Sequence, residues 1–133
     1  MQKFTSNSET DAIDRDFFQQ LRRELDREIS GYVYEIPAGT IGNPLSTDVI
    51  RTYLNSMRLC LVEPHWEEVE ICTSEESVTG VGVRRMCVTM AEDQGYVLVL
   101  DPVDERYHLA WRSEHGLGTW GICGNGVECF IAR

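Results

Sequence analysis

The fold is decided by residues 81–112, which read VGVRRMCVTMAEDQGYVLVLDPVDERYHLAWR. Short segments rich in apolar and β-branched side chains are separated here by two polar turn segments, 92–95 and 101–104. That pattern is typical of antiparallel strands joined by tight turns. We therefore predict three consecutive strands, over 81–91, 96–101 and 107–112. The middle strand is apolar on both faces, which favours a central position in the sheet.

The strand pattern extends on both sides of this segment. Further strands are predicted over 59–63, 66–73, 118–123 and 127–132. The last two flank Asn125-Gly126, a dipeptide that favours a two-residue hairpin turn. In the resulting register Ile122 faces Cys129, so one face of this hairpin is apolar and packs on a core.

Ahead of residue 59 the spacing of apolar side chains indicates helices. Every fourth side chain is apolar along one segment, at Ile13, Phe17, Leu21, Leu25 and Ile29. We expect this helix to be capped by Ser8, Thr10 or Asp11 and to end at Gly31. A second helix is predicted to begin at the cap Ser46-Thr47-Asp48 and to carry one apolar stripe, formed by Val49, Ile50, Tyr53, Leu54 and Met57.

These elements predict a single α+β domain, in which two N-terminal helices pack on one face of a twisted antiparallel β-meander sheet. The chain of 133 residues has the length of one domain. Within it we expect a frayed start over 1–10, a helical part over 11–58 and the meander over 59–133. The other face of the sheet, or its edge, is expected to display acidic side chains.

The chain is acidic, with 12 basic residues, 22 acidic residues and a net charge of −10. Two stretches, 63–76 and 92–105, contain acids and no Lys or Arg, and a tryptophan lies within the first. Such a surface repels nucleic acid and anionic membranes, because both are bound by cations. The sequence therefore predicts a basic protein partner. The candidate contact residues are Trp66, Glu67, Glu68, Glu70, Glu75, Glu76, Asp101, Asp104 and Glu105.

Several features favour a cytoplasmic protein. The five cysteines form no CxxC pair and no regular framework, which is typical of reduced thiols. The longest apolar runs, 59–62 and 96–100, are far shorter than the ~20 residues of a membrane-spanning helix. The first eleven residues also lack the hydrophobic stretch of a secretory signal.

No motif in the chain predicts catalysis. Cys123 lies in a glycine-rich segment, 121–126, but Asn125 stands where a nucleophile elbow needs glycine. The histidines and cysteines lack the close paired spacing of zinc ligands. The loop over 39–44 lacks the lysine and hydroxyl residue that end a Walker phosphate loop. We therefore expect no enzyme activity, no metal and no cofactor.

In its size, its acidity, its lack of catalytic motifs and its order of helices followed by a meander, the chain resembles bacterial immunity proteins. That class neutralises polymorphic or contact-delivered toxins. The resemblance concerns general organisation and implies a cognate toxin, often a nuclease or another enzyme with a cationic cleft, bound tightly. An acidic mimic of nucleic acid would share this surface. The alternative is a small-molecule-binding or regulatory module with a pocket between helices and sheet.

Overall fold

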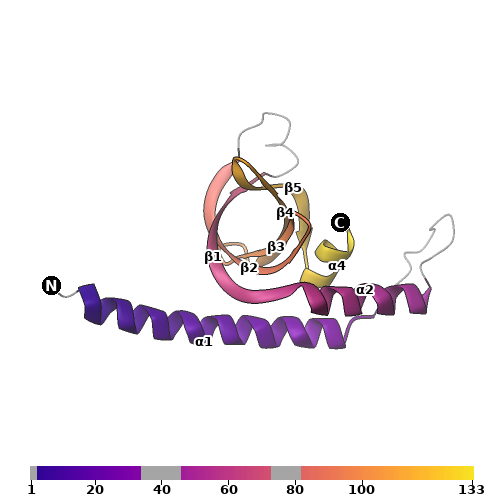
Figure 1. The fold of residues 1–133 in the computed structure, drawn as a ribbon, viewed down its shortest axis with the longest axis horizontal. Coiled ribbons are helices and arrows are strands. Elements are labelled where there is room, and N and C mark those ends of the chain that lie inside the picture. The colour runs from indigo at the N-terminus through magenta and orange to yellow at the C-terminus, as the bar shows by residue number, and fades with distance from the viewer. Residues whose placement is uncertain (1–2, 34–45, 73–81) are drawn as a thin grey trace.

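The structure, a computed structural model, describes residues 3–33, 46–72 and 82–133, with the backbone alone for 3–11. Strands curl into a ring, and helices lie along one side of it (Figure 1). The α+β class is therefore as predicted. In chain order the described elements are α1 (Lys3–Ser30), α2 (Thr47–Cys60), β1 (Leu61–Ile71), β2 (Val83–Asp93), β3 (Tyr96–Asp101), β4 (Arg106–Ser113), β5 (Gly116–Gly124) and α4 (Gly126–Ile131).

The strands form a closed barrel in the order β1-β2-β3-β4-β5. Consecutive strands pair antiparallel, as the meander predicts, and the central position of β3 between β2 and β4 is confirmed. A parallel contact, in which Val69 pairs with Leu117, joins β1 to β5 and closes the ring. We expected the other face of the sheet, or its edge, to display acidic side chains; closure instead turns that face into the lining of a second core.

Strand β1 runs without a break through Pro64, where two separate strands were expected over 59–63 and 66–73. The pairing with β2 shifts register between Leu61 and His65, which marks a bulge. Proline lacks the N–H that a regular ladder requires, and a bulge tolerates it. The proline therefore bends β1 around the barrel and does not end it.

Two hydrophobic cores hold the fold together. The inner face of the barrel buries Val69, Ile71, Cys87, Val97, Val99, Ala110 and Leu117. The outer core lies between the barrel and the helices, and its fully buried side chains include Leu25, Met57, Leu98, Leu109 and Phe130. Alternate residues of β3 thus enter different cores, which explains why its sequence is apolar on both faces.

Helix α1 begins at Lys3, so the caps predicted at Ser8, Thr10 or Asp11 are wrong. Among its described side chains, the apolar stripe is buried from Leu21 onward, because the helix extends beyond the barrel toward its N-terminus (Figure 1). Ile13 accordingly is 67% exposed, whereas Leu25 is buried. In α2 the predicted cap is confirmed: the Ser46 side chain accepts a hydrogen bond from the Val49 amide.

The predicted strand over 127–132 is wrong, because this segment forms helix α4. Asn125 is the N-cap, and its side chain accepts a hydrogen bond from the Glu128 amide at 2.8 Å. Asparagine is favoured both in hairpin turns and at helix N-caps, so the residue alone does not separate the two structures. Helical spacing buries both Val127 and Phe130 in the outer core, and this burial favours the helix over the hairpin strand.

Candidate functional site

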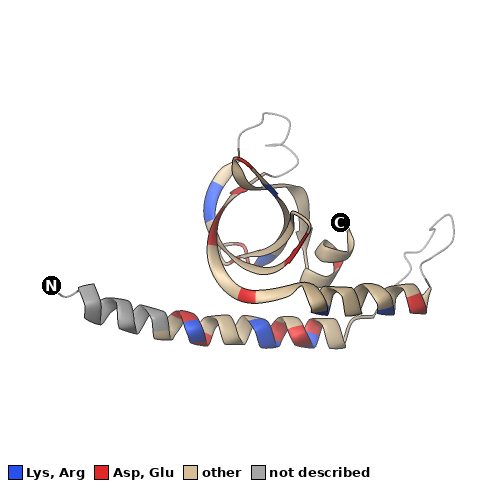
Figure 2. Ribbon diagram, viewed as in Figure 1, with Lys and Arg blue, Asp and Glu red and all other residues tan. Residues whose placement is uncertain are grey.

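The three acids predicted on β1 are neutralised by arginines from β2 and β4. Arg84 on β2 contacts Glu68 at 2.9 Å and Glu70 at 3.9 Å. Arg112 on β4 contacts Glu67 at 2.9 Å. Figure 2 shows Lys and Arg positions interspersed among acidic positions on the strands. The long acidic run in the sequence is therefore not an equally acidic surface.

Glu67 belongs to a dense polar cluster at one end of the barrel. Its carboxylate accepts hydrogen bonds from the Thr89 hydroxyl at 2.9 Å and from Arg112, which also donates to Glu92 at 2.7 Å. The Arg112 hydrogen bonds hold the pKa of Glu67 at about 2, although burial acts in the opposite direction. The cluster ties β1, β2 and β4 together, so its role is structural.

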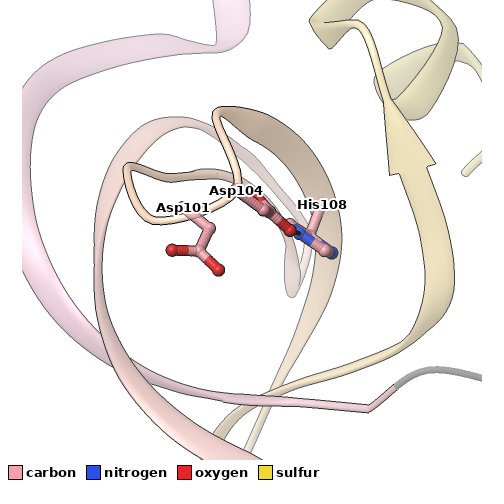
Figure 3. Close-up of side chains that lie close together, drawn as sticks. All are labelled: Asp101, Asp104 and His108. Atoms are coloured by element: carbon pink, nitrogen blue, oxygen red, sulfur yellow. Dashed lines mark hydrogen bonds and ion pairs between the residues drawn. The ribbon is translucent and has the colours of Figure 1, made fainter.

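A second polar cluster lies around the turn between β3 and β4 (Figure 3). Asp101 is completely buried, although we expected it on the surface, and Arg85 contacts it at 2.6 Å. Asp104 accepts hydrogen bonds from His108 Nε2 at 3.0 Å and from the Arg106 amide at 2.9 Å. This cluster fixes the turn against the end of the barrel.

The potential ligand atoms of Asp101, Asp104 and His108 lie within 4.8 Å of one another, a spacing that a metal ion can bridge. Their partners argue against that use. The Asp101 oxygens already accept from Arg85 and from the Val103 amide, and both Asp104 oxygens are also engaged. The buried Nδ1 of His108 lacks a partner within the described residues, but the nitrogen that faces Asp104 is Nε2. A guanidinium at this position disfavours a cation.

Trp66 packs between β1 and α1. Its ring lies 6.0 Å from that of Phe17 and 5.8 Å from that of Phe18, measured between centroids. It therefore helps to hold the helix on the barrel. Glu75 and Glu76, the other two predicted contact residues of this run, lie outside the described residues.

A groove of about 470 Å³ lies between α1 and the segment that joins β3 to β4. Three carboxylate residues and a tyrosine face it, and no Lys or Arg lines it within the described chain. Of the predicted contact residues described, only Glu105 lines this groove. The lining residues are Phe17, Gln20, Leu21, Glu24, Leu25, Glu28, Leu100, Pro102, Glu105 and Tyr107.

The three glutamates of the groove differ in what they bind. Glu28 is already used, because its carboxylate accepts hydrogen bonds from the first amides of α4, at Gly126 and Val127. Glu24 is exposed and accepts one hydrogen bond, from Gln20 at 3.2 Å. Glu105 is exposed, and neither Glu24 nor Glu105 has an ion pair with any described residue.

The backbone presents Glu105 in an unusual conformation. Its φ is 57°, in the left-handed region that favours glycine. Its amide donates to the Asp101 carbonyl at 2.9 Å, which closes the turn. A strained non-glycine residue at the edge of a cavity is a feature often found at functional positions.

Tyr107 reports the electrostatic character of the groove. Its pKa is raised, first by burial and then by the negative charges of Glu28 and Glu24. The groove thus combines a negative potential with an apolar lining from Leu21, Leu25 and other residues. A group that is both cationic and partly aliphatic suits it.

Most of this groove was missed by reasoning from the sequence. Glu24 stands beside Leu25, at the border of the apolar stripe of α1, and an acid at that border can face a neighbouring element. That signal was available. No signal in the sequence indicates that Pro102 and Tyr107 also line the groove, because this depends on how α1 crosses the barrel.

No protein family, curated protein or solved structure matches the chain. Among the helices that the structure describes, none is long and apolar enough to span a membrane.

Proposed function

We propose that the protein is a non-enzymatic acidic binding protein, which acts as the cognate inhibitor of a basic protein. Its partner would be a toxin or another enzyme with a cationic active site. The general resemblance to immunity proteins supports this class, as does the net charge of −10. An acidic surface raises the rate of association with such a partner and disfavours acidic competitors.

The observation that carries the proposal is the contrast between paired and unpaired acids. On β1, Glu67, Glu68 and Glu70 are occupied by arginines of the same chain. At the groove, Glu24 and Glu105 have no such counter-charge within the described residues. Negative charge that the fold leaves uncompensated in a groove is a natural contact for a positively charged partner.

The test is affinity capture from native cell lysate with three matched baits. One bait is the wild-type chain, the second is Glu24→Gln/Glu105→Gln, and the third is Glu68→Gln/Glu70→Gln. Both variants remove two negative charges, but the groove variant removes acids without an ion pair in the described chain, whereas the control removes acids that pair with Arg84. We expect one stoichiometric basic protein on the wild-type and control baits at low salt, and a marked loss on the groove variant.

Inhibition is then tested on the retained protein. If it is an enzyme, its activity should fall in proportion to added wild-type chain, until one equivalent is present. Equal capture by all three baits, or capture without inhibition, would contradict the proposal.

A second candidate, a module that binds a small cationic molecule, is favoured by the size of the groove. Small-molecule sites are commonly about 300–1,000 Å³, and this groove of about 470 Å³ lies between α1 and the barrel, where a pocket was expected. A ligand of this kind raises the melting temperature with the logarithm of its excess concentration. A thermal-shift screen of polyamines and amino-acid amides distinguishes this candidate from an inhibitor that responds only to protein.

A further inference from the structure

We infer that the groove between α1 and the β3–β4 turn receives an arginine side chain of the partner protein. This inference rests on the proposed function and specifies its contact. The groove offers exposed carboxylates at Glu24 and Glu105 and an apolar lining that includes Leu21, Leu25 and Leu100. An arginine combines an aliphatic stem with a charged head, which matches both features.

The charges of the lining residues determine whether a cation or an anion is favoured in the groove. The described lining residues comprise three glutamates and neither lysine nor arginine. The Glu28 carboxylate accepts hydrogen bonds from the first amides of α4, and its charge still contributes to the local potential. An anion would be repelled by all three, and a purely apolar group would leave the carboxylates of Glu24 and Glu105 facing it without compensation. A cation is therefore the favoured occupant.

The rest of this chain shows how the fold compensates other exposed or half-buried acids. Arg112 places one guanidinium between Glu67 and Glu92, with Nε to Glu92 at 2.7 Å and Nη2 to Glu67 at 2.9 Å. Arg84 similarly lies between Glu68 and Glu70. The groove also carries two exposed carboxylates, but its described lining supplies no guanidinium. The missing group fits an arginine from outside the chain.

Arginine suits this groove better than lysine. Its planar guanidinium presents its N–H donors in a fixed fork that matches a carboxylate, and it stacks on aromatic rings. Phe17 and Tyr107 both line the groove and supply such rings. A lysine ammonium is a compact, strongly hydrated charge, and it gains less from an aromatic and apolar lining.

The inference is tested with short peptides on the full chain. A capped Gly-Arg-Gly peptide is titrated into isotopically labelled protein, and the amide resonances are followed by NMR. Otherwise identical peptides carry lysine, or citrulline, which has the shape of arginine without its charge. We expect the arginine peptide to shift the amides of Leu100, Glu105 and Tyr107. The citrulline peptide should bind at least about tenfold more weakly, as the loss of charge-assisted hydrogen bonds implies.

Variants locate the effect. Glu24→Gln/Glu105→Gln should abolish the shifts, and the equally discharged Glu68→Gln/Glu70→Gln variant should retain them. Dispersed amide spectra of both variants show that each is folded. Equal binding of arginine and citrulline peptides overturns the charge argument, and equal binding of the lysine peptide overturns the choice of arginine. Shifts confined to another surface overturn the site.

This outcome is separate from that of the proposed function. A basic protein that is captured equally by the groove variant and the wild type binds through another surface, and the groove inference then fails without affecting the existence of a basic partner. Arginine-specific shifts without any basic partner in the lysate leave the groove chemistry standing and remove the support for an inhibitor.

Discussion

The acids of β1 and the acids of the groove carry the same charge but occupy different environments. Glu67 and Glu68 are each within 2.9 Å of an arginine that comes from another strand. Glu24 and Glu105, which line the groove, have no ion pair with the described residues. The first set stabilises the fold, whereas the second forms the contact that we propose for a partner.

This contrast shows why net charge does not locate a binding surface. The run over 63–76 contains no cation in the sequence, yet strand pairing brings Arg84 opposite Glu70. Closure of the barrel likewise brings Arg112 to Glu67, across 45 positions of the chain. Acids separated by many residues, such as Glu24 and Glu105, meanwhile come to line one groove.

The largest expected effect comes from breaking the polar cluster of Glu67, Glu92 and Arg112. Arg112→Leu leaves Glu67 and Glu92 without their shared partner, and we expect a loss of about 2 kcal/mol in the free energy of unfolding. This is less than for a fully buried pair, about 3–5 kcal/mol, because the Arg112 side chain is 39% exposed. Arg84→Leu is the matched control: its exposed pairs should contribute under about 1 kcal/mol. Urea denaturation of both variants measures the difference, and equal losses would contradict the distinction.

Acid should weaken the same cluster. The pKa of Glu67 is lowered from 4.5 to about 2, so its carboxylate binds protons less readily in the folded chain than in the unfolded one. Its contribution is therefore complete above pH 4.5 and is lost as the pH falls toward 2. We expect it to be on the order of 1–2 kcal/mol after allowance for solvent screening.

Glu67→Gln provides the measurement. The difference in unfolding free energy between the wild type and this variant should shrink as the pH is lowered from 5 to 2. Glu68→Gln, which alters only an exposed pair, should show little such change. A difference between wild type and Glu67→Gln that stays constant over this range would show that the Arg112 hydrogen bonds do not depend on the Glu67 charge.

The sequence predicted local structure better than it predicted closure. The Ser46 cap and the strands from β2 to β4 follow from neighbouring residues, and the structure confirms them. The parallel contact between β1 and β5 joins Val69 and Leu117, which are far apart in the sequence, so no local pattern predicts it. Helix α4 was missed because its docking to Glu28 and to the outer core, and not its own propensity, determines its structure.

The same limit applied to the candidate site. Glu105 was identified from its place in an acidic run, but its relation to α1 was not. Asp101, in the same run, is fully buried and bound to Arg85. Alternation along β3 places Asp101 on the inner face with Val97 and Val99, and that assignment requires knowing that the barrel has an inner face.

Two turns of the barrel each contain a non-glycine residue in the left-handed region. Gln94 in the β2–β3 turn and Glu105 in the β3–β4 turn are the described non-glycine residues with positive φ, at 50° and 57°. Both are exposed, but only Glu105 lines the groove. Each conformation is costly for a residue with a Cβ, and glycine removes that cost.

Replacement of each residue by glycine therefore tests separately how the left-handed conformation affects stability and how the side chain affects binding. Gln94→Gly and Glu105→Gly should each stabilise the fold by about 0.5 kcal/mol, because relief of strain exceeds the added entropy of the unfolded chain. Thermal unfolding measures both. Binding of the arginine peptide should weaken in Glu105→Gly alone, since Gln94 lies outside the groove. If both variants bind equally well, the Glu105 carboxylate does not contact the arginine, and the inferred site is contradicted. If Glu105→Gly instead gains stability and loses binding, the protein keeps a strained glutamate at this position for recognition, although glycine is more stable there.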